Sequence, residues 1–192
     1  DFGRDNARRN LNLYRDKITS FNDDMQGTGA TALACVWSGI KAANTNPVDQ
    51  RIVILGAGTA GCGIADQISA MQVDQGLTQA ESEQQFWLVD REGLLFDDMP
   101  GLLGFQKPYA RSAKERANFI GDIDQQVQLE AVVAAIKPTI LIGCSTCHGA
   151  FTESIVRTMA EHCERPIILP LSNPTRLSEA RAEDLIHWSG GR

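Results

Sequence analysis

The sequence lacks a long hydrophobic run and has no excess of basic residues. Its longest apolar stretches, such as TILIGC and PIILPL, have the length of strands, whereas a membrane-spanning helix needs roughly 18–20 apolar residues. The 18 lysines and arginines are outnumbered by 24 aspartates and glutamates, which gives a formal net charge of −6. The short apolar runs lead us to expect no membrane as a partner. Because phosphate binding requires a basic face, we do not expect a nucleic acid as a partner either.

The composition excludes several further classes of protein. Hydrophobic residues make up 43% of the chain and charged residues 22%, which is ordinary for a soluble globular protein and unlike a disordered, collagen-like or coiled-coil chain. A length of 192 residues suits one domain. The chain begins at Asp1 without an initiator methionine, so we expect it to be a piece of a longer protein.

The number of cysteines is odd, and the sequence shows no hydrophobic core of a secretory signal peptide. We therefore expect reduced core thiols in a cytoplasmic protein. The five cysteines stand mostly within apolar segments: Cys35, Cys62, Cys144, Cys147 and Cys163.

Four short apolar runs alternate with helical segments along the chain. The runs are RIVIL at 51–55, FWLVD at 86–90, TILIGC at 139–144 and IILPL at 167–171. Short apolar strands in this alternation predict a parallel sheet that is buried on both faces. Right-handed crossovers then give an α/β, doubly wound, Rossmann-like domain with helices on both faces.

Helical spacing of apolar residues occurs between and before these runs. We expect a short strand or turn at 19–23 (TSFND). Asn46-Pro47 is expected to end the helix that starts near residue 27, and Thr152 to cap a later helix. The helical segments are 7–17, 27–44, 63–72, 129–136, 151–163 and 179–188, and 72–85 is expected to add a solvated helix.

A G-x-G-x-x-G pattern directly follows the first apolar run and opens a helix, which is the context that dinucleotide binding requires. Gly56 allows the tight turn, Gly58 lets a pyrophosphate approach the backbone, and Gly61 lets helix and strand pack closely. The helix N-terminus supplies free N–H groups and partial positive charge. The alternative is a glycine turn with a structural role only. The pattern consists of Gly56, Ala57, Gly58, Thr59, Ala60 and Gly61.

Asp90 ends the second apolar run, where an acidic side chain can accept the hydroxyls of an adenine ribose and repel a 2′-phosphate. It lies further from the glycines than the usual distance of roughly 20 residues, and the extra helix at 72–85 accounts for the difference. Arg91 follows directly, and its guanidinium leaves NADP open as the cofactor. The pair predicts the adenosine end of the site.

Asp23 and Asp24 stand together where the predicted turn meets a helix. Adjacent carboxylates repel each other unless a cation lies close, and hard oxygen ligands suit Mg²⁺ or Mn²⁺. Acidic residues at the start of a helix also interact favourably with its dipole. The residues alone leave a metal site and a helix-start pair equally open.

The sequence Cys144-Ser145-Thr146-Cys147-His148 spells C-x-x-C-H, the attachment pattern of c-type haem. A covalent haem at the end of a sheet strand would disrupt the fold. A zinc site would need a second chelating pair, and His162 and Cys163 do not supply one because adjacent residues of a helix face different ways. We interpret the segment as a strand-end loop facing a nicotinamide. Asn173 follows the last apolar run, and its amide can donate to a carboxylate or carboxamide.

Taken together, these motifs resemble the NAD-binding domain of malic enzymes, of the bacterial NAD-linked type. The resemblance rests on FNDDMQGTGA, ILGAGTAGCGIA, FWLVDREGLL, the loop ending in GAFTE, and PLSNPT, and it covers essentially the whole chain. It implies an NAD-binding domain over 1–192, in which 1–46 is a metal-ligand segment with leading helices and 47–192 is the Rossmann core.

The resemblance also implies a role for individual residues. Asp1 and Asp24 would be ligands of Mg²⁺ or Mn²⁺, and Asp23 would pair with the catalytic lysine. Gln106 stands where NADP-preferring members often carry lysine, which favours NAD, although Lys107 is its neighbour. The remaining implied contacts are Thr28 and Gly56–Gly61 with the NAD phosphates, Asp90 with the adenine ribose, Ser145 and Thr146 with the nicotinamide, and Asn173 with nicotinamide and substrate.

The implied activity is oxidative decarboxylation of L-malate to pyruvate and CO₂ by a homo-oligomeric enzyme, a dimer or tetramer. Family members are far longer, and their catalytic tyrosine and lysine come from an N-terminal region. The chain also stops before the family's second substrate asparagine, so we expect it to be inactive alone. A non-catalytic NAD-binding module and another Rossmann dehydrogenase, such as an amino-acid dehydrogenase, remain as alternatives.

Overall fold

A five-stranded sheet in the order β3-β2-β1-β4-β5 forms the centre of the molecule. The computed structural model describes residues 4–119 and 126–192. The four predicted apolar runs form parallel strands, with Ile52 opposite both Phe86 and Ile140. The predicted α/β, doubly wound sheet is thereby confirmed. The parallel strands are β1 (Ile52–Leu55), β2 (Phe86–Asp90), β4 (Ile140–Gly143) and β5 (Ile167–Pro170).

The sheet has one strand that the sequence pattern does not predict. β3 (Gly93–Leu94) runs antiparallel to β2 and pairs with its last two residues. The Leu94 N–H also donates to the Val127 carbonyl at 2.8 Å, beyond the edge of the sheet. Two residues are too few to show a strand periodicity, which is why the element was not predicted.

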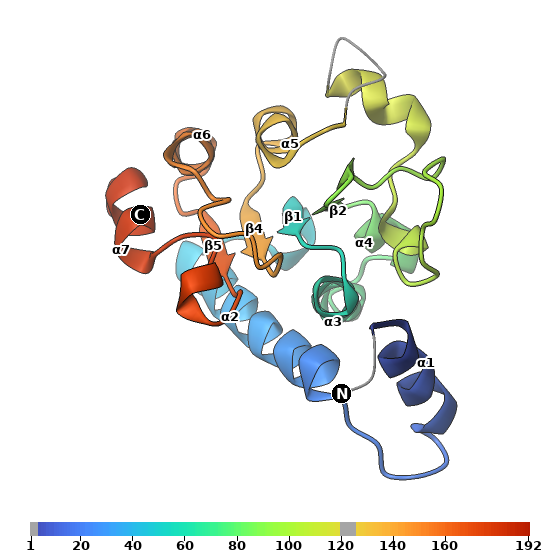
Figure 1. Cartoon of the computed structure of the whole chain (residues 1–192). Coiled ribbons are helices and arrows are strands. Elements are labelled where there is room, and N and C mark those ends of the chain that lie inside the picture. Colours follow the sequence, from blue (N-terminus) through green and yellow to red (C-terminus); the bar gives the residue numbers. More distant parts are fainter. Residues whose placement is uncertain (1–3, 120–125) are drawn as a thin grey trace.

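Helices cover both faces of the sheet (Figure 1). α2 (Thr28–Ala43) and α3 (Thr59–Asp74) pack on one face, and α5 (Leu129–Ile136) and α6 (Glu153–His162) on the other. Because side chains alternate along a strand, Ile52 and Ile54 of β1 join the core with α2 and α3, and Val53 joins the core with α5 and α6.

The leading segment shares its hydrophobic core with the sheet. Ala32, Val36 and Ile40 of α2 are buried in the same cluster as the residues of β1 and α3. α1 (Arg4–Tyr14) is attached to α3 by an ion pair between Arg8 and Asp66. The Tyr109 hydroxyl donates to the same carboxylate at 2.8 Å.

The helix ends follow local chemistry. Thr152 caps α6 as predicted, accepting from the Ile155 N–H at 3.3 Å. α2 ends at Ala43, three residues before Asn46, because Asn44 takes a left-handed conformation with φ 52°. The expected solvated helix within 72–85 is the short α4 (Gln79–Glu83), with a capping box between Thr78 and Glu81.

Two stretches differ from the predicted pattern. The final helix, α7 (Ala182–Trp188), starts three residues later than the pattern at 179–188, because Glu179 is fully buried below the sheet's edge loops. The long segment after β2 contains short 3₁₀ helices at Lys107–Tyr109 and Ala113–Asn118. None of the helices in the described ranges is both long and apolar enough to cross a membrane.

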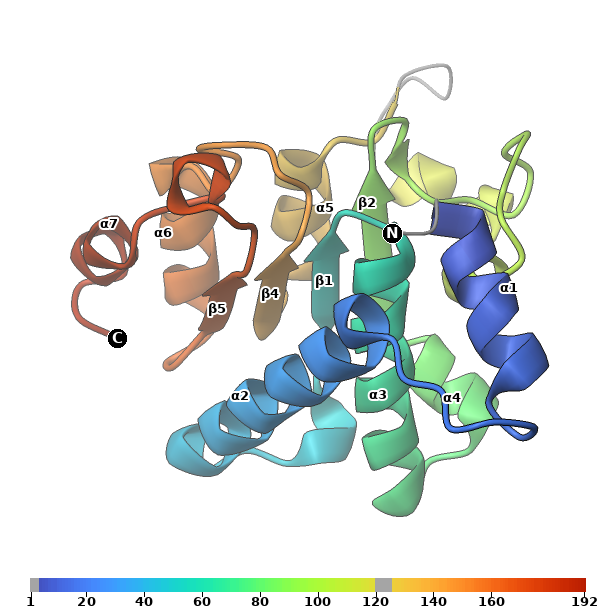
Figure 2. The same ribbon diagram turned by 60° about the horizontal axis from the view of Figure 1, so that its bottom comes forward.

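The four parallel strands end at one edge of the sheet, seen at the top of Figure 2. The helices that follow β1 and β4 lie on opposite faces of the sheet, since α3 follows β1 and α6 follows β4. Ligands of doubly wound sheets bind outside the carboxyl ends of the strands at such a switch point. This carboxyl edge carries the candidate site.

Candidate functional site at the carboxyl edge

The glycine-rich turn joins β1 to α3 in the middle of the carboxyl edge. Gly56 has a φ of 103° and donates its N–H to the Val89 carbonyl at 2.7 Å, continuing the β1–β2 pairing. A Cβ at Gly61 would lie 1.9 Å from the Gly56 carbonyl oxygen. These two positions therefore require glycine for the turn to close.

The first turn of α3 presents N–H groups to the carboxyl edge. Gly58 precedes the helix in an extended conformation and no side chain caps the helix. The first N–H that reaches back to Gly58 is that of Cys62, at 3.0 Å. The N–H groups of Thr59 and Ala60 lie ahead of this bond and lack an intrahelical partner, which is the arrangement that binds anionic oxygens.

Asp90 ends β2 beside this turn and is half-buried. One carboxylate oxygen accepts the Arg91 N–H at 3.0 Å. Asp90 and the exposed Arg91 line a cavity of about 620 Å³, with Met99, Leu102 and Gln106 on its other side. The cavity combines apolar walls with a carboxylate at its rim, as a nucleoside site requires.

Gln106 joins this cavity to the glycine turn. Its side chain is buried, with its amide N–H₂ donating to the Ala57 carbonyl at 2.8 Å and its oxygen accepting the Leu103 N–H at 2.9 Å. Both functional groups of the amide are thus engaged by the backbone. The side chain supports the turn, in addition to the cofactor-preference role that the sequence predicts for it.

Two loops carry the other predicted cofactor residues to the same edge. Ser145 and Thr146 follow β4, and Asn173 follows β5 and is exposed. Thr146 has a φ of 58°, a conformation that a β-branched residue adopts only when its surroundings enforce it. Its N–H donates to the Ser172 hydroxyl at 2.8 Å, which ties the two loops together.

A buried carboxylate lies beneath these two loops. Glu179 is fully buried, and its carboxylate accepts hydrogen bonds from the main chain and hydroxyls of Ser145 and Ser172. The side chains that would contact a nicotinamide are therefore mounted on a hydrogen-bonded base.

The C-x-x-C-H segment is divided between the interior and the surface. The Cys144 thiol donates to the Gly56 carbonyl at 3.2 Å, and burial, with smaller contributions from the negative charges of Glu179 and Asp90, raises its pKa to about 12. Cys147 and His148 are exposed, with the His148 Nδ1 3.1 Å from the Ser178 carbonyl. The segment forms the strand-end loop that the sequence predicts.

The acidic pair Asp23 and Asp24 lies in the first turn of a π-helix, Asp23–Gly27, which leads directly into α2. Asn22 caps this turn by accepting the Met25 N–H at 3.0 Å, and Gln26 accepts the Asn22 N–H at 2.9 Å. Both carboxylates are exposed. Their position satisfies the helix-start interpretation and leaves both side chains open to ligands from outside this chain.

The same turn packs against the helix that follows the glycines. A Cβ at Gly63 of α3 would lie 3.2 Å from the Met25 carbonyl, and Thr28 at the start of α2 is half-buried beside it. The structure thus brings the acidic turn and Thr28 to the flank of α3. Asp1, the other predicted metal ligand, lies outside the described residues.

The donor set for a metal ion is incomplete within residues 4–119 and 126–192. No group of three or more histidine, cysteine, aspartate or glutamate side chains there is placed to hold an ion. Asp24 offers the hard oxygen that Mg²⁺ and Mn²⁺ prefer, but further ligands would have to come from elsewhere.

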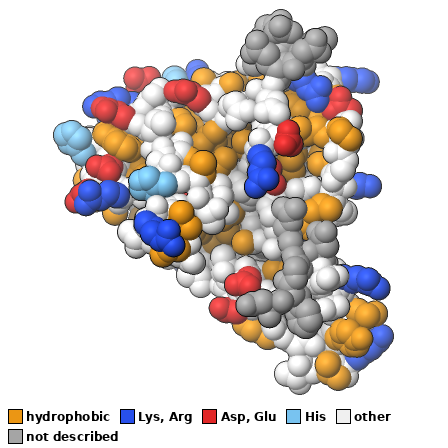
Figure 3. All heavy atoms as spheres, in the orientation of Figure 1, with side chains coloured by type: hydrophobic (Ala, Val, Ile, Leu, Met, Phe, Trp, Pro, Cys, Tyr) orange, Lys and Arg blue, Asp and Glu red, His pale blue; other side chains and the backbone are white. Residues whose placement is uncertain are grey.

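The surface at the carboxyl edge is largely uncharged on the side of the β4 and β5 loops (Figure 3).

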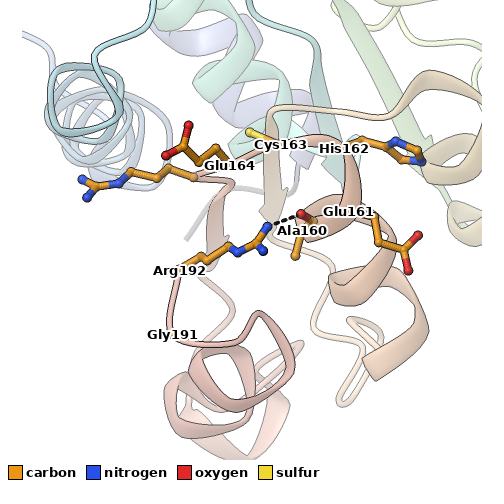
Figure 4. Close-up of a pocket in the computed structure, with 8 residues that line it drawn as sticks. Ala160, Glu161, His162, Cys163, Glu164, Gly191 and Arg192 are labelled. Carbon is orange, nitrogen blue, oxygen red and sulfur yellow. Dashed lines mark hydrogen bonds between the residues drawn. The ribbon is translucent and has the colours of Figure 1, made fainter.

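A second cavity, of about 570 Å³, lies at the opposite edge of the sheet, between the C-terminal end of α6 and Arg192 (Figure 4). The Arg192 guanidinium donates to the Ala160 carbonyl at 2.6 Å. None of the predicted site residues lines this cavity.

Comparison with known proteins decides the family. The model for "Malic enzyme, NAD binding domain" matches residues 25–192. The chain belongs to the malic enzyme family. It is 56% identical to NAD-dependent malic enzyme 3 of Bacillus subtilis and 52% identical to a malolactic enzyme of Lactiplantibacillus plantarum. Each alignment covers 100% of the chain, which spans 34% of the length of these relatives.

The fold agrees with solved malic enzymes. The NAD-dependent malic enzyme from Thermotoga maritima superposes with a TM-score of 0.69 at 20% identity, over 94% of this chain and 42% of that one. At that level of identity the likeness shows the fold. The resemblance to malic enzymes and the Rossmann-like architecture drawn from the sequence are both confirmed.

The sequence analysis did not identify several residues that support the candidate site. Glu179 and Ser172 hold the two loops, and Gly143 leaves the space that the Glu179 carboxylate fills, since a Cβ there would lie 2.5 Å from its Cδ. A lone glutamate in a polar stretch carries no pattern. Gly143 at the end of a strand is the only signal in the sequence, and its role becomes clear only once Glu179 is known to pack against it.

Proposed function

We propose that this chain is the cofactor-binding part of an NAD-dependent malic enzyme that converts L-malate into pyruvate and CO₂ with the help of a divalent metal ion. The observation that carries the proposal is the convergence at one sheet edge of the open N–H groups of α3, Asp90 and the two serine-containing loops. Membership of the malic enzyme family supports it.

The chain's residues would bind and orient the dinucleotide. The N–H groups at Thr59 and Ala60 face the position of the pyrophosphate, and Thr28 approaches from the neighbouring helix. The Asp90 carboxylate, with one oxygen left by its bond to Arg91, accepts the adenine ribose hydroxyls. Asp90 disfavours a 2′-phosphate through charge repulsion, which is why we propose NAD and not NADP.

The other half of the cofactor would lie on the loops after β4 and β5. Ser145 and Thr146 line the nicotinamide side, and the exposed Asn173 amide can hold the substrate's carboxylate or the carboxamide of the ring. Bound NAD supplies the hydride acceptor for C2 of malate. The loops therefore set the distance between cofactor and substrate, on which the rate depends steeply.

Asp24 would provide one metal ligand and Asp1 another, completed by groups from the rest of the polypeptide. A divalent cation, when bound, polarises the C2 oxygen and stabilises the charge left as CO₂ departs. Asp23, on the same turn, would pair with a lysine outside this chain and keep it protonated near the substrate. Because these partners lie elsewhere, we propose that the isolated chain is inactive.

The first experiment measures NADH production by the full-length enzyme with malate, NAD and Mn²⁺. Since a metal ion contributes several kcal/mol, Asp24→Ala is expected to lower kcat by roughly a thousandfold. Asp16→Ala, an exposed acid in the loop after α1, serves as the control and should leave the rate unchanged. Normal activity in EDTA would contradict the proposal.

A second candidate follows from the 52% identity to a malolactic enzyme. In that case the NADH formed in the first step would return its hydride to pyruvate, giving lactate and CO₂ from malate and one proton. Identifying the product separates the two: pyruvate with accumulating NADH supports the malic reaction, and lactate without net NADH supports the malolactic one. Binding of NADH without any turnover by the full-length protein would indicate a non-catalytic module.

A further inference from the structure

Glu179 is a buried carboxylate that the proposed chemistry does not use. It is 0% exposed. Its Oε1 accepts the Ser145 N–H at 2.9 Å, the Ser145 hydroxyl at 2.8 Å and the Ser172 hydroxyl at 2.5 Å, and its Oε2 accepts the Ser172 N–H at 3.3 Å. Both serines belong to the loops at the nicotinamide end of the site.

The partners of Glu179 are donors without charge. None of the ion pairs within the described ranges involves this carboxylate. An ionised carboxylate is an acceptor only, so it satisfies all four donors at once, and such bonds are stronger than those between neutral groups. Removing the acceptor would leave four donors of the two loops without their partner, which is costly in the interior.

The hydrogen bonds continue from the two serines to the exposed tips of the loops. The Ser172 hydroxyl accepts the Thr146 N–H at 2.8 Å, and the Ser145 hydroxyl accepts the Cys147 N–H at 3.1 Å. The left-handed backbone of Thr146 is thereby fixed from both sides. One carboxylate thus holds the segment after β4 and the segment after β5 as a single unit.

The surrounding fold leaves room for this carboxylate alone. β4 ends at Gly143, where a Cβ would lie 2.5 Å from the Glu179 Cδ and 2.7 Å from its Oε2. The main chain at Glu179 is also held, because the Phe151 N–H donates to the Glu179 carbonyl at 3.0 Å and the Gly149 N–H to the Ser178 carbonyl at 3.3 Å. The carboxylate therefore has one position, below the two loops.

We propose that Glu179 is a positioning residue for the nicotinamide half of the cofactor, acting through Ser145 and Ser172. The inference rests on the proposed function and deepens it. Glu179 does not touch the dinucleotide; it sets the spacing between the Ser145–Thr146 loop and the Ser172–Asn173 loop. Neither the glycine turn nor Asp90 makes a hydrogen bond to Glu179, so we expect the pyrophosphate and adenosine contacts to depend on it much less.

The test compares NADH with ADP-ribose, which carries the adenosine and both phosphates but lacks the nicotinamide ring. In the full-length enzyme, calorimetric titration of Glu179→Gln should give a Kd for NADH raised roughly tenfold, with the Kd for ADP-ribose unchanged within about twofold. The amide keeps the shape of the side chain but turns an N–H₂ toward a donor. Glu130→Gln, an exposed glutamate on α5, is the matched control and should change neither constant.

If Glu179 had a role in stability alone, its substitution would raise the Kd values of NADH and ADP-ribose together, or neither. Either result would overturn the proposal. Ser172→Ala provides the second variant if Glu179→Gln fails to fold, since it removes one hydroxyl, which donates to Glu179 and accepts from Thr146, and leaves the other three donors to the carboxylate in place. It should weaken NADH selectively by about threefold to fivefold. If the unsubstituted enzyme binds ADP-ribose but not NADH, Glu179 has no such role; if it binds neither, the proposed function itself is wrong.

Discussion

The two ends of the candidate site are held in place by different means. At the adenosine end, the main chain itself sets the geometry: Gly56 and Gly61 meet at a distance that no other residue allows. At the nicotinamide end, the geometry is set by side-chain hydrogen bonds to one buried carboxylate, Glu179. The first arrangement leaves a spacing pattern in the sequence, and the second leaves none.

The difference can be tested from the glycine turn. Gly61→Ala would push a Cβ into the Gly56 carbonyl, 1.9 Å away, so the turn must open. We expect NADH and ADP-ribose affinity to fall by roughly a hundredfold or more and stability by about 2–3 kcal/mol. Titration calorimetry and thermal melting measure both. In the control, Gly104→Ala, nothing lies within 4 Å of the new Cβ and little should change. Wild-type affinity in Gly61→Ala would contradict the claim that the close contact between Gly61 and Gly56 sets the shape of the turn.

A second prediction concerns Asp90, also at the adenosine end. Asp90→Ala removes an acceptor for the ribose hydroxyls, and we expect the Kd values of both NADH and ADP-ribose to rise roughly 20-fold. The preference for NAD over NADP should narrow, because the repulsion of a 2′-phosphate is lost. Asp74→Ala, at the exposed end of α3, is the control. A loss confined to NADH would place the adenosine elsewhere.

Gly143→Ala tests the nicotinamide end by steric means. Its Cβ would displace the Glu179 carboxylate, which lies within 2.5–2.7 Å of that position. We expect NADH affinity to fall by roughly fivefold to tenfold, while ADP-ribose binding persists. Loss of both ligands in Gly61→Ala, against loss of NADH alone in Gly143→Ala, is what distinguishes the two ends. Equal losses for both ligands in Gly143→Ala would show that the ends are not independent.

The smallest expected effect is on stability, at Cys144 between the two ends. Its folded-state pKa of about 12 exceeds that of an unfolded thiol, about 8.5, so the folded chain keeps a proton that the unfolded chain releases. Stability is therefore lost as pH rises above about 8.5. Between pH 8.5 and 9.5 the loss should be about 1 kcal/mol in guanidinium unfolding, and Cys144→Ser should abolish that share. The exposed Cys147→Ser is the control; an unchanged pH dependence in Cys144→Ser would contradict the assignment.

Much of the fold could be predicted from the sequence, because its signals are local. The apolar runs at 51–55 and 139–144 predict buried parallel strands, which form as β1 and β4, and Thr152 predicts the start of α6. The two-residue β3 and the late start of α7 could not be predicted. Both depend on contacts distant in the chain, with Val127 and with the serines around Glu179.

The candidate site divides in the same way. The glycine pattern and the acid at the end of β2 have meaning at fixed spacings, so Gly56 and Asp90 could be found directly. The support that Gln106 gives to Ala57 and the bond from Cys144 to Gly56 appear only in three dimensions. Asp23 and Asp24 are placed by the structure at a helix start, and their role with a metal ion stays a prediction.

The most direct measurement is a crystal structure of the full-length enzyme with NAD bound. The account predicts the pyrophosphate within hydrogen-bond distance of the N–H groups at Thr59 and Ala60, the adenosine beside Asp90, and the nicotinamide between the loops of Ser145 and Asn173. A dinucleotide bound at the opposite edge, in the cavity beside Arg192, or lying away from the glycine turn would contradict it.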